Sequence, residues 1–135
     1  MTRVCLDTNV WISGLIKPSV TSSKVVELAM KKRFHVVCST SILMEMEKNL
    51  IFKFGVNARF AKKICFRISQ VADVYEPVGS IKLIPNQHAD NLILETALMG
   101  KAKYLVTGDW QHLLSMRSFH NIKIIPPARF LEILG

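Results

Sequence analysis

The stretch Arg3-Val4-Cys5-Leu6-Asp7-Thr8-Asn9, at the start of the chain, decides how the fold is interpreted. The run from Arg3 to Leu6 is short and apolar, which is typical of a buried strand. Asp7 ends this run, and a helix-like stretch follows at residues 10–16. A buried strand that leads at once into a helix is the first half of a βαβ unit, which favours an α/β fold.

The rest of the chain continues this alternation of extended and helical patterns. We expect further strands at residues 34–38, 74–78, 104–106 and 122–125, the second of them a poor edge strand because Pro77 interrupts it. We expect helices that start near Ser22 and Asn57, at about residues 42–54, from Asp90 to Gly100, at residues 110–116 and from Pro126 to Leu134, after a break at residues 17–19. Several strands are fully apolar, which predicts a parallel sheet covered on both faces.

Length and composition indicate one folded domain over residues 1–135. The chain has 135 residues, of which 50% are hydrophobic and 21% charged, so a disordered or fibrous protein is excluded. No apolar run is long enough to span a membrane, and Arg3 and Asp7 interrupt any signal peptide, so we expect a cytoplasmic protein. Cys5, Cys38 and Cys65 are far apart within apolar stretches, and we interpret them as core residues.

The charge balance indicates a polyanionic partner. The chain has 18 Lys and Arg against 10 Asp and Glu, a net charge of +8 at pH 7. Nucleic acid is the leading candidate for that partner. An acidic protein or a membrane surface would also fit the charge.

Four of the ten acids lie where a parallel sheet would bring them together. Asp7 and Asp109 each follow an apolar strand directly, Asp90 lies in the first turn of a helix, and Glu45 lies early in the helix after the second strand. In such sheets, chemistry gathers beyond the carboxyl ends of the strands. Taken singly, each acid has a plainer interpretation: an Asx-turn for Asp7, helix N-caps for Asp90 and Asp109, and a solvated helix residue for Glu45. The presence of all four acids near one edge of the sheet favours a functional site.

Clustered carboxylates need a compensating cation, because each raises the pKa of the others. Mg²⁺ prefers oxygen ligands and keeps several waters, which suits a set of Asp and Glu without Cys or His, and Mn²⁺ would fit the same set. A metal ion held there polarises a phosphoryl oxygen and lowers the pKa of a bound water. Hydrolysis of a phosphodiester bond is the reaction that these parts fit best.

Five motifs in order along the chain resemble the PIN-domain nucleases, and specifically the stand-alone VapC-like toxins of toxin-antitoxin pairs. The motifs are Val4-Cys5-Leu6-Asp7-Thr8-Asn9-Val10, residues 39–50 with Glu45, Asp90-Asn91-Leu92-Ile93-Leu94-Glu95-Thr96-Ala97, Tyr104-Leu105-Val106-Thr107-Gly108-Asp109, and the ending Ile124-Ile125-Pro126-Pro127-Ala128-Arg129-Phe130-Leu131. Together they cover nearly the whole chain.

The resemblance implies a three-layer α/β/α domain with a five-stranded parallel sheet in the order 3-2-1-4-5, which sets Asp7 beside Asp109. It implies hydrolysis of RNA with Mg²⁺ or Mn²⁺, a homodimer, and inhibition by an antitoxin whose C-terminal segment enters the groove. The family's acidic site maps onto Asp7, Glu45, Asp90 and Asp109, of which Asp7, Asp90 and Asp109 bind metal, and its supporting polar residues map onto Asn9, Ser13 and Thr107.

The chain departs from the family pattern in two places. The loop before Asp90 reads Asn86-Gln87-His88-Ala89 where relatives are often Asp-rich, and an acid that often follows Asp109 is replaced by Gln111 or His112. A second metal ion is therefore an open question. The preference for Glu45 over Glu47 comes from the resemblance, because helical periodicity alone does not exclude Glu47.

A basic, acid-free stretch separates the second and third acids of the site. Its cations are Lys48, Lys53, Arg59, Lys62, Lys63 and Arg67, which form either a solvated helix pair or a surface that contacts phosphates. Phe52, Phe54, Phe60 and Phe66 are interleaved with them, as core, dimer interface or stacking platforms for bases. Trp11 and Trp110 could pack in the core or line the groove.

Three classes of function remain open. The first is a metal-dependent endoribonuclease of a toxin-antitoxin pair, and the second is a PIN-like RNA-binding module that has little or no activity. The third is a phosphoryl-handling domain of another doubly wound family, such as a receiver, for which Asp73 and Lys123 fit the required roles poorly. No glycine-rich phosphate loop is present, which disfavours a nucleotide-binding enzyme.

Overall fold

A computed structural model describes residues 1–16, 19–109 and 111–135 of the chain. Its centre is a sheet of β1 (Arg3–Leu6), β2 (His35–Ser39), β3 (Ala72–Tyr75), β4 (Tyr104–Val106), β5 (Ser118–Phe119) and β6 (Ile122–Ile125). The strand order is β3-β2-β1-β4-β6-β5, and every pair is parallel except β5 with β6. The predicted order is confirmed, with β6 as the fifth parallel strand. The two-residue antiparallel strand β5 at the edge was not expected from the sequence.

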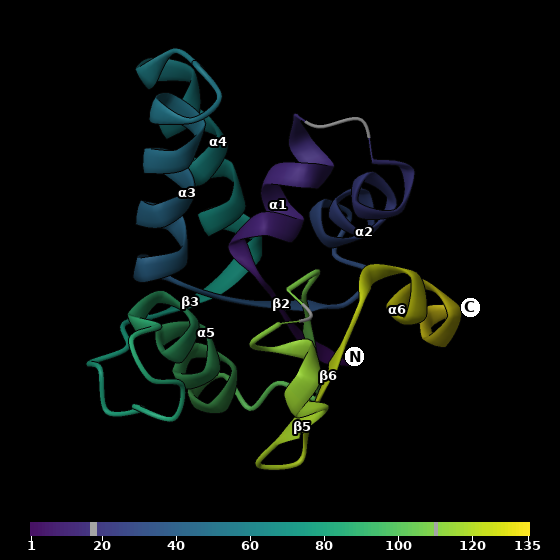
Figure 1. Cartoon of the computed structure of the whole chain (residues 1–135). Helices are drawn as coiled ribbons and strands as arrows, with labels where there is room; N and C mark the ends of the chain where they lie inside the picture. Colours follow the sequence, from purple (N-terminus) through teal and green to yellow (C-terminus); the bar gives the residue numbers. More distant parts are fainter. Residues whose placement is uncertain (17–18, 110) are drawn as a thin grey trace.

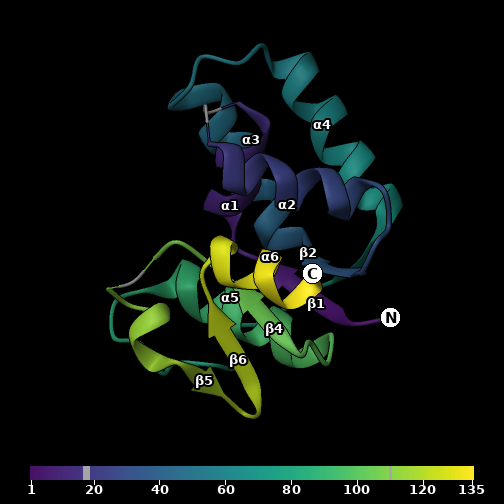
Figure 2. The same ribbon diagram turned by 90° about the vertical axis from the view of Figure 1, so that its right-hand side faces the viewer.

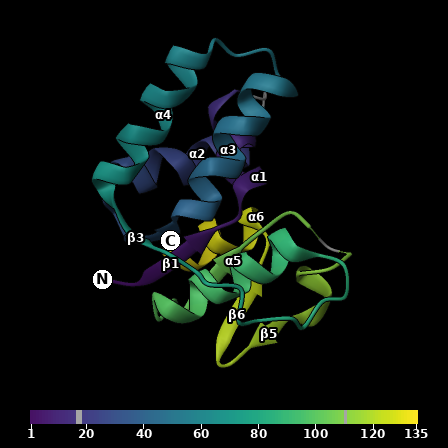
Figure 3. The ribbon, with the colours of Figure 1, turned by 90° about the vertical axis from the view of Figure 1, so that its left-hand side faces the viewer.

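The helices cover both faces of this sheet, so the molecule has the predicted three layers (Figures 1 and 2). They are α1 (Thr8–Leu15), α2 (Val20–Met30), α3 (Thr40–Phe52), α4 (Ala58–Val71), α5 (His88–Met99), the 3-10 turn η1 (Leu114–Met116) and α6 (Pro127–Leu134). Helices α1 to α4 lie together on one side and α5 lies on the other, while α6 packs against α2. The pair α3 and α4 extends away from the sheet (Figure 3).

Side chains that precede the helices fix several of their starts. Ser39 Oγ accepts a hydrogen bond from the Ile42 backbone N–H at 3.2 Å, and Asn57 Oδ1 accepts one from the Arg59 N–H at 2.8 Å. Both are N-caps of the kind expected from the sequence. Gly55 adopts a φ of +65°, a left-handed conformation that suits glycine, in the turn between α3 and α4. The Ser39 cap starts α3 directly after β2, and the Gly55 turn and the Asn57 cap start α4 soon after α3.

Two expectations about the helices are wrong. The buried face of α4 consists of Ala61, Cys65 and Ile68, whereas Phe60, expected on that face, is 57% exposed. The small side chains of Ala61 and Cys65 allow α4 to approach α3 closely, and the Cys65 thiol lies 3.5 Å from the Leu43 carbonyl oxygen. The helix expected at residues 110–116 is only the turn η1 within the described residues. Trp110 lies outside them.

The core is continuous around the inner strands of the sheet. Trp11, Phe34, Leu105 and Phe130 are fully buried, with Phe34 and Phe130 packed edge to face at 5.1 Å between ring centroids. Trp11 is therefore a core residue and not part of a groove. All three cysteines are buried and unpaired, as expected from the sequence. In the described part of the chain, no helix has both the length and the apolar character to span a membrane.

Candidate active site

Asp7 lies at the centre of the candidate site, at the end of β1. Its side chain is only 3% exposed, and its backbone N–H donates to the Val106 carbonyl of β4 at 2.9 Å. Asp7 precedes α1, but its carboxylate caps no N–H of that helix within the described chain. The plainer interpretation of Asp7 as a local turn residue is therefore not supported, because its side chain accepts a hydrogen bond from Thr107, the residue after β4.

Thr107 connects the acids that end the two central strands. Its buried hydroxyl donates to Asp7 Oδ2 at 2.7 Å and accepts from the Asp109 backbone N–H at 3.0 Å. Asp109 Oδ1 in turn accepts from the N–H groups of Gln111 and His112, both at 3.2 Å. Asp109 thus caps a turn and lies beside Asp7, but it is not the helix N-cap of its plainer interpretation, because the N-cap position of η1 is Leu113.

Asp90 and Glu45 approach the same centre from helices on opposite sides of the sheet. Asp90 lies in the first turn of α5, which begins at His88, so Asp90 is not the N-cap of that helix. Glu45 lies in the second turn of α3. Both side chains are half-buried. Four separate stretches of the chain therefore deliver one acid each.

The pKa values of these acids show that their charges interact. Burial raises the pKa of Asp7 to about 6; the Thr107 hydrogen bond opposes this shift, and the charges of Asp90, Glu45 and Asp109 add to it. Burial also raises the pKa of Asp90, as do the nearby Asp109 and Glu45, while His112 opposes the shift. These carboxylates are close enough to repel one another at neutral pH.

No lysine or arginine of the described residues forms an ion pair with an acid of this cluster. The ion pairs found in the described chain join Arg3 to Asp73, Lys24 and Lys31 to Glu27, and Arg129 to Glu132. All of these ion pairs involve acids outside the cluster. A protein of net charge +8 thus leaves its four clustered acids without a direct cationic partner, which is the electrostatic condition under which a divalent cation binds favourably.

Glu45 and Glu47 of α3 have different neighbours. Burial raises the pKa of Glu45, with Lys53 and Lys48 opposing the shift, and its charge acts on both Asp7 and Asp90. Glu47 acts instead on the buried Cys65 thiol of α4. Two residues apart on a helix, the two side chains leave α3 in different directions. Glu45 is therefore the glutamate that lies with the cluster.

The polar residues expected to support the acids divide into two groups. Thr107 is in direct contact with the cluster, as described above. Asn9 is exposed and Ser13 is half-buried, and neither side chain forms a hydrogen bond to any described residue. Sequence reasoning passed over Thr8, whose buried hydroxyl also lacks a partner in the described chain and directly follows Asp7. Its place next to a strand-end Asp was the available signal.

The donor set fits a hard divalent cation by its chemistry. Asp7, Asp90 and Asp109 offer carboxylate oxygens, and the buried thiols lie apart from them as core residues. Across the described ranges, no three His, Cys, Asp or Glu side chains already have the spacing of a metal-ligand set.

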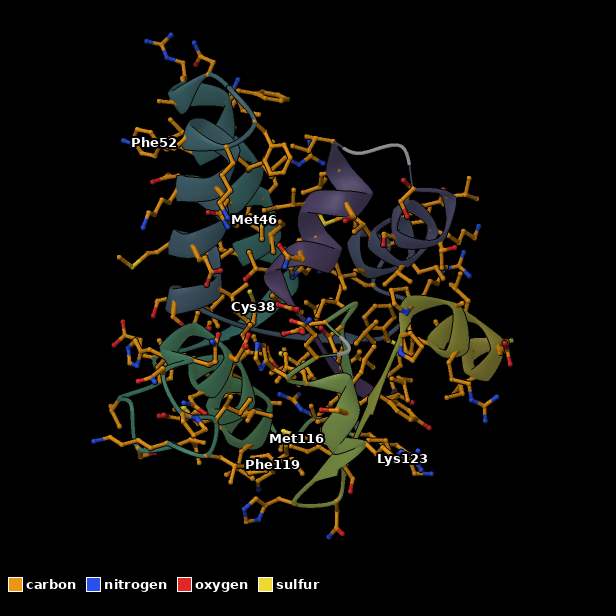
Figure 4. The ribbon with its side chains drawn as sticks, in the orientation of Figure 1. Cys38, Met46, Phe52, Met116, Phe119 and Lys123 are labelled. Atoms are coloured by element: carbon orange, nitrogen blue, oxygen red, sulfur yellow. The ribbon has the colours of Figure 1, made fainter. Side chains whose placement is uncertain are left out.

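A groove of about 710 Å³ lies between α3 and the first turn of α5, and Glu45 is the acid of the cluster that lines it. Its α3 side also includes Glu47, Lys48, Phe52 and Lys53, and its α5 side includes His88. Figure 4 shows Phe52 projecting outward from the far end of α3. The groove thus joins an acid of the cluster to two lysines and an exposed aromatic ring.

The six cations of the basic stretch do not form one surface. All six are exposed, but only Lys48 and Lys53 line the groove beside Glu45. Lys63 and Arg67 line a second groove of about 800 Å³ between α4 and the ends of α1 and α2, together with Phe60 and Phe66. Arg59 and Lys62 are exposed elsewhere on α4. The interpretation of these phenylalanines as core residues is wrong for Phe52, Phe60 and Phe66, which are 80%, 57% and 63% exposed.

Comparison with known proteins gives three likenesses. A family model described as "PIN domain" matches residues 3–111, a range that contains all four acids. A protein of Methanocaldococcus jannaschii described as uncharacterized is 28% identical over 142 residues, which cover 96% of this chain and 90% of that protein. VapBC2 from Rickettsia felis, solved bound to a DNA fragment from its promoter, is similar with a TM-score of 0.64 and 16% identity, over 93% of this chain and 98% of that chain. At that identity, the structural likeness shows the fold alone.

Proposed function

Because the chain belongs to the PIN-domain family, we propose that it is a metal-dependent endoribonuclease that hydrolyses RNA phosphodiester bonds. PIN domains are generally nucleases, and hence hydrolases. The observation that carries the proposal is the convergence of Asp7, Glu45, Asp90 and Asp109. The neighbouring acids add to the raised pKa values of Asp7 and Asp90, and none of the four forms an ion pair with a described residue. We further propose that residues 1–135 act as a single domain.

In this proposal, Asp7, Asp90 and Asp109 hold Mg²⁺ or Mn²⁺. When bound, such an ion supplies positive charge to the phosphate oxygens and lowers the pKa of a water. Thr107 is a positioning residue, because its hydroxyl fixes one oxygen of Asp7 and its Oγ1 also holds the backbone of Asp109. Asn9 lies in the first turn of α1 and Ser13 lies one turn further along it, and both would support ligands or water.

Glu45 is the proposed proton acceptor for the attacking water. Burial raises its pKa above the ordinary value for a glutamate, which brings it nearer the operating pH of a general base. Lys48 and Lys53, in the same groove, would bind the phosphates of the substrate. Arg59, Lys62, Lys63 and Arg67 of α4 would add affinity from outside this groove.

We propose that the protein is the toxin of a toxin-antitoxin pair and forms a homodimer. The fold likeness to the VapBC2 complex of Rickettsia felis supports an antitoxin protein as partner. A toxin that cuts cellular RNA would act in the cytoplasm, the location expected from the sequence. The open second groove beside α4 offers apolar surface for contact with another protein.

One observation favours the second candidate, an RNA-binding module with little or no activity. The positions after Asp109 are Gln111 and His112, where the family often carries a further acid. Such a module would bind RNA through the same basic groove but would not cut it. The two candidates differ in one measurable property, which is cleavage.

The experiment is a cleavage assay on a pool of single-stranded and structured RNA with purified protein and Mg²⁺, Mn²⁺ or EDTA. The Asp7→Asn variant serves as matched control, since it removes the charge and keeps the shape. Cleavage that needs the metal and disappears in the variant supports the nuclease. Full activity in Asp7→Asn would overturn the site assignment, and RNA binding without any cleavage would favour the inactive module.

A further inference from the structure

Phe52 is a large apolar side chain in an unusual place. It is 80% exposed at the last residue of α3, although a ring of this size normally gains about 1.5–3 kcal/mol from burial. It is not isolated on the surface, because it lines the groove that also contains Glu45. An exposed ring on the wall of a groove next to an acidic site has the properties of a ligand contact.

The spacing of the residues on α3 aligns this ring with the site. Glu45, Lys48 and Phe52 are separated by three and four residues and so lie on one face of the helix. With a rise of about 1.5 Å per residue, Phe52 lies about 10 Å beyond Glu45 along the axis. At a spacing of about 3.4 Å per stacked nucleotide, this is at most about three nucleotides.

Two lysines provide the positive charge of this groove, which also contains Glu45 and Glu47. Lys48 and Lys53 form no ion pair with the described residues, and both act on the charge of Glu45. His88 and Ala89, in the first turn of α5, line the other side of the groove. The lysines of α3 therefore place positive charge beside Phe52, where the phosphates that adjoin a stacked base would lie.

We propose that this face of α3 is a binding subsite for the unpaired strand that flanks the cut phosphate, in which Phe52 stacks on a base and Lys48 and Lys53 bind the adjoining phosphates. The subsite rests on the proposed nuclease function and specifies its substrate as single-stranded. A stacking ring needs a base whose face is free, which a duplex does not offer. The pairing of an exposed aromatic ring with two unpaired lysines is typical of single-strand binding surfaces.

The test measures binding of a fluorescein-labelled 12-nucleotide oligouridine by anisotropy, with EDTA present so that the RNA stays intact. Phe52→Ala is compared with Phe66→Ala, which removes a ring of similar exposure from the second groove. Because stacking contributes about 1–3 kcal/mol per base, we expect Phe52→Ala to weaken binding by about 5- to 100-fold. Phe66→Ala should change it less than twofold, and Phe52→Trp should restore it.

A duplex ligand and a measurement of self-association show whether the effect of Phe52→Ala is specific to binding of single-stranded RNA. Binding of the same strand paired with oligoadenosine should not depend on Phe52. Equal effects of Phe52→Ala and Phe66→Ala, or no effect of either, would overturn the subsite. Loss of self-association in Phe52→Ala, measured by sedimentation with RNA binding unchanged, would also overturn it and assign the ring to contact with a second copy.

The wild-type cleavage assay, run in parallel with Mg²⁺ or Mn²⁺, separates the subsite from the nuclease. Binding that depends on Phe52 without any cleavage would contradict the proposed function and leave the subsite supported. Cleavage of the single strand that is equally fast in Phe52→Ala would contradict the subsite and leave the nuclease supported.

Discussion

The carboxylate of Asp7 is buried, where the charged form is energetically unfavourable. The side chain is 3% exposed, its hydroxyl partner Thr107 is fully buried, and three other acids act on it. Burial and like charge both favour the protonated form, which is why its pKa is raised to about 6. A metal ion would remove this cost, so stability and metal binding should be linked at this residue.

The first prediction is that Asp7→Asn stabilises the metal-free protein at neutral pH. Between its ordinary value of 3.8 and about 6, the folded state keeps a proton that the unfolded state has released. The free energy of unfolding of the wild type should therefore fall as the pH rises through this window, by about 1–3 kcal/mol. The free energy of unfolding of Asp7→Asn, measured with urea in EDTA, should not fall over this pH window. A wild type that gains stability over the same window would contradict the assignment.

The second prediction distinguishes the two glutamates of α3. Glu45→Gln should lower kcat/KM for RNA cleavage by about 100-fold or more, because the group acts on the reacting water. Glu47→Gln should change kcat/KM less than about threefold, since its charge acts on Cys65 and not on the cluster. Both variants keep side-chain size and lie on one helix. A larger loss in Glu47→Gln would reverse the assignment.

At the residue scale, the sequence predicted the acids better than their surroundings. Asp7 and Asp109 directly follow apolar strands, so their common edge could be inferred from strand endings alone. Thr8 was marked only by its place next to Asp7, and the sequence does not show that its hydroxyl is buried without a partner in the described chain. Glu45 could be preferred over Glu47 only through the family resemblance, since the helical period places Glu47 among the apolar residues of the helix and so does not exclude it.

Helix α5 fixes the loop that leads into it through two buried side chains. Glu95 accepts backbone N–H groups from Val78 at 2.6 Å, Gly79 at 3.0 Å and Ser80 at 2.9 Å. Asn91 bonds both the N–H and the carbonyl of Ile84, at 2.9 and 2.8 Å. The same helix carries Asp90, so these bonds also hold one acid of the candidate site in place.

The third prediction is that Glu95→Ala lowers the free energy of unfolding by about 2–4 kcal/mol, because three N–H groups lose a charged acceptor. Burial acts to raise the pKa of Glu95, but the backbone hydrogen bonds outweigh it and lower the pKa below 4.5. The stabilisation should therefore be present above pH 4.5 and be lost as the pH falls through the lowered pKa.

The control for Glu95 is Glu132→Ala on α6. Glu132 is exposed and pairs only with the exposed Arg129, so its replacement should cost less than about 1 kcal/mol. Urea unfolding of both variants across the acidic range gives the comparison. Equal stabilities for the two variants would contradict the role of Glu95 in holding the loop.

At the element scale, the sequence predicted the order and type of most elements, and erred where tertiary packing decides. Periodicity gave α4 an apolar face with Phe60, whereas the protein buries the face with Ala61 and Cys65. A hydrophobicity pattern favours the largest side chains, but close helix packing favours small ones. Strand β5 is only two residues long, too short to leave a pattern.

The whole molecule combines a strongly positive surface with a negative centre. The net charge is +8, yet the four acids of the candidate site lie together at the carboxyl ends of the central strands. The positive surface attracts a polyanion, while the negative centre repels its phosphates unless a cation intervenes. Binding and cleavage should therefore respond differently to salt and to metal.

The fourth prediction is that RNA affinity in EDTA falls with salt. If two to four lysines and arginines contact phosphates, affinity should drop by about 7- to 50-fold between about 50 and about 200 mM salt. Lys48→Ala should reduce the slope of log affinity against log salt by about 0.7. Lys63→Ala, in the second groove, is the matched control and should reduce it less. A flat salt response would indicate a protein partner instead.

The central claim is that Asp7, Asp90 and Asp109, from three separate elements, close around one divalent cation. The most direct test is anomalous scattering from a crystal grown with Mn²⁺, under conditions in which the protein cleaves RNA. We predict a manganese peak bound by carboxylate oxygens of these three residues. Cleavage with no such peak, or with a peak only at other side chains, would contradict the claim.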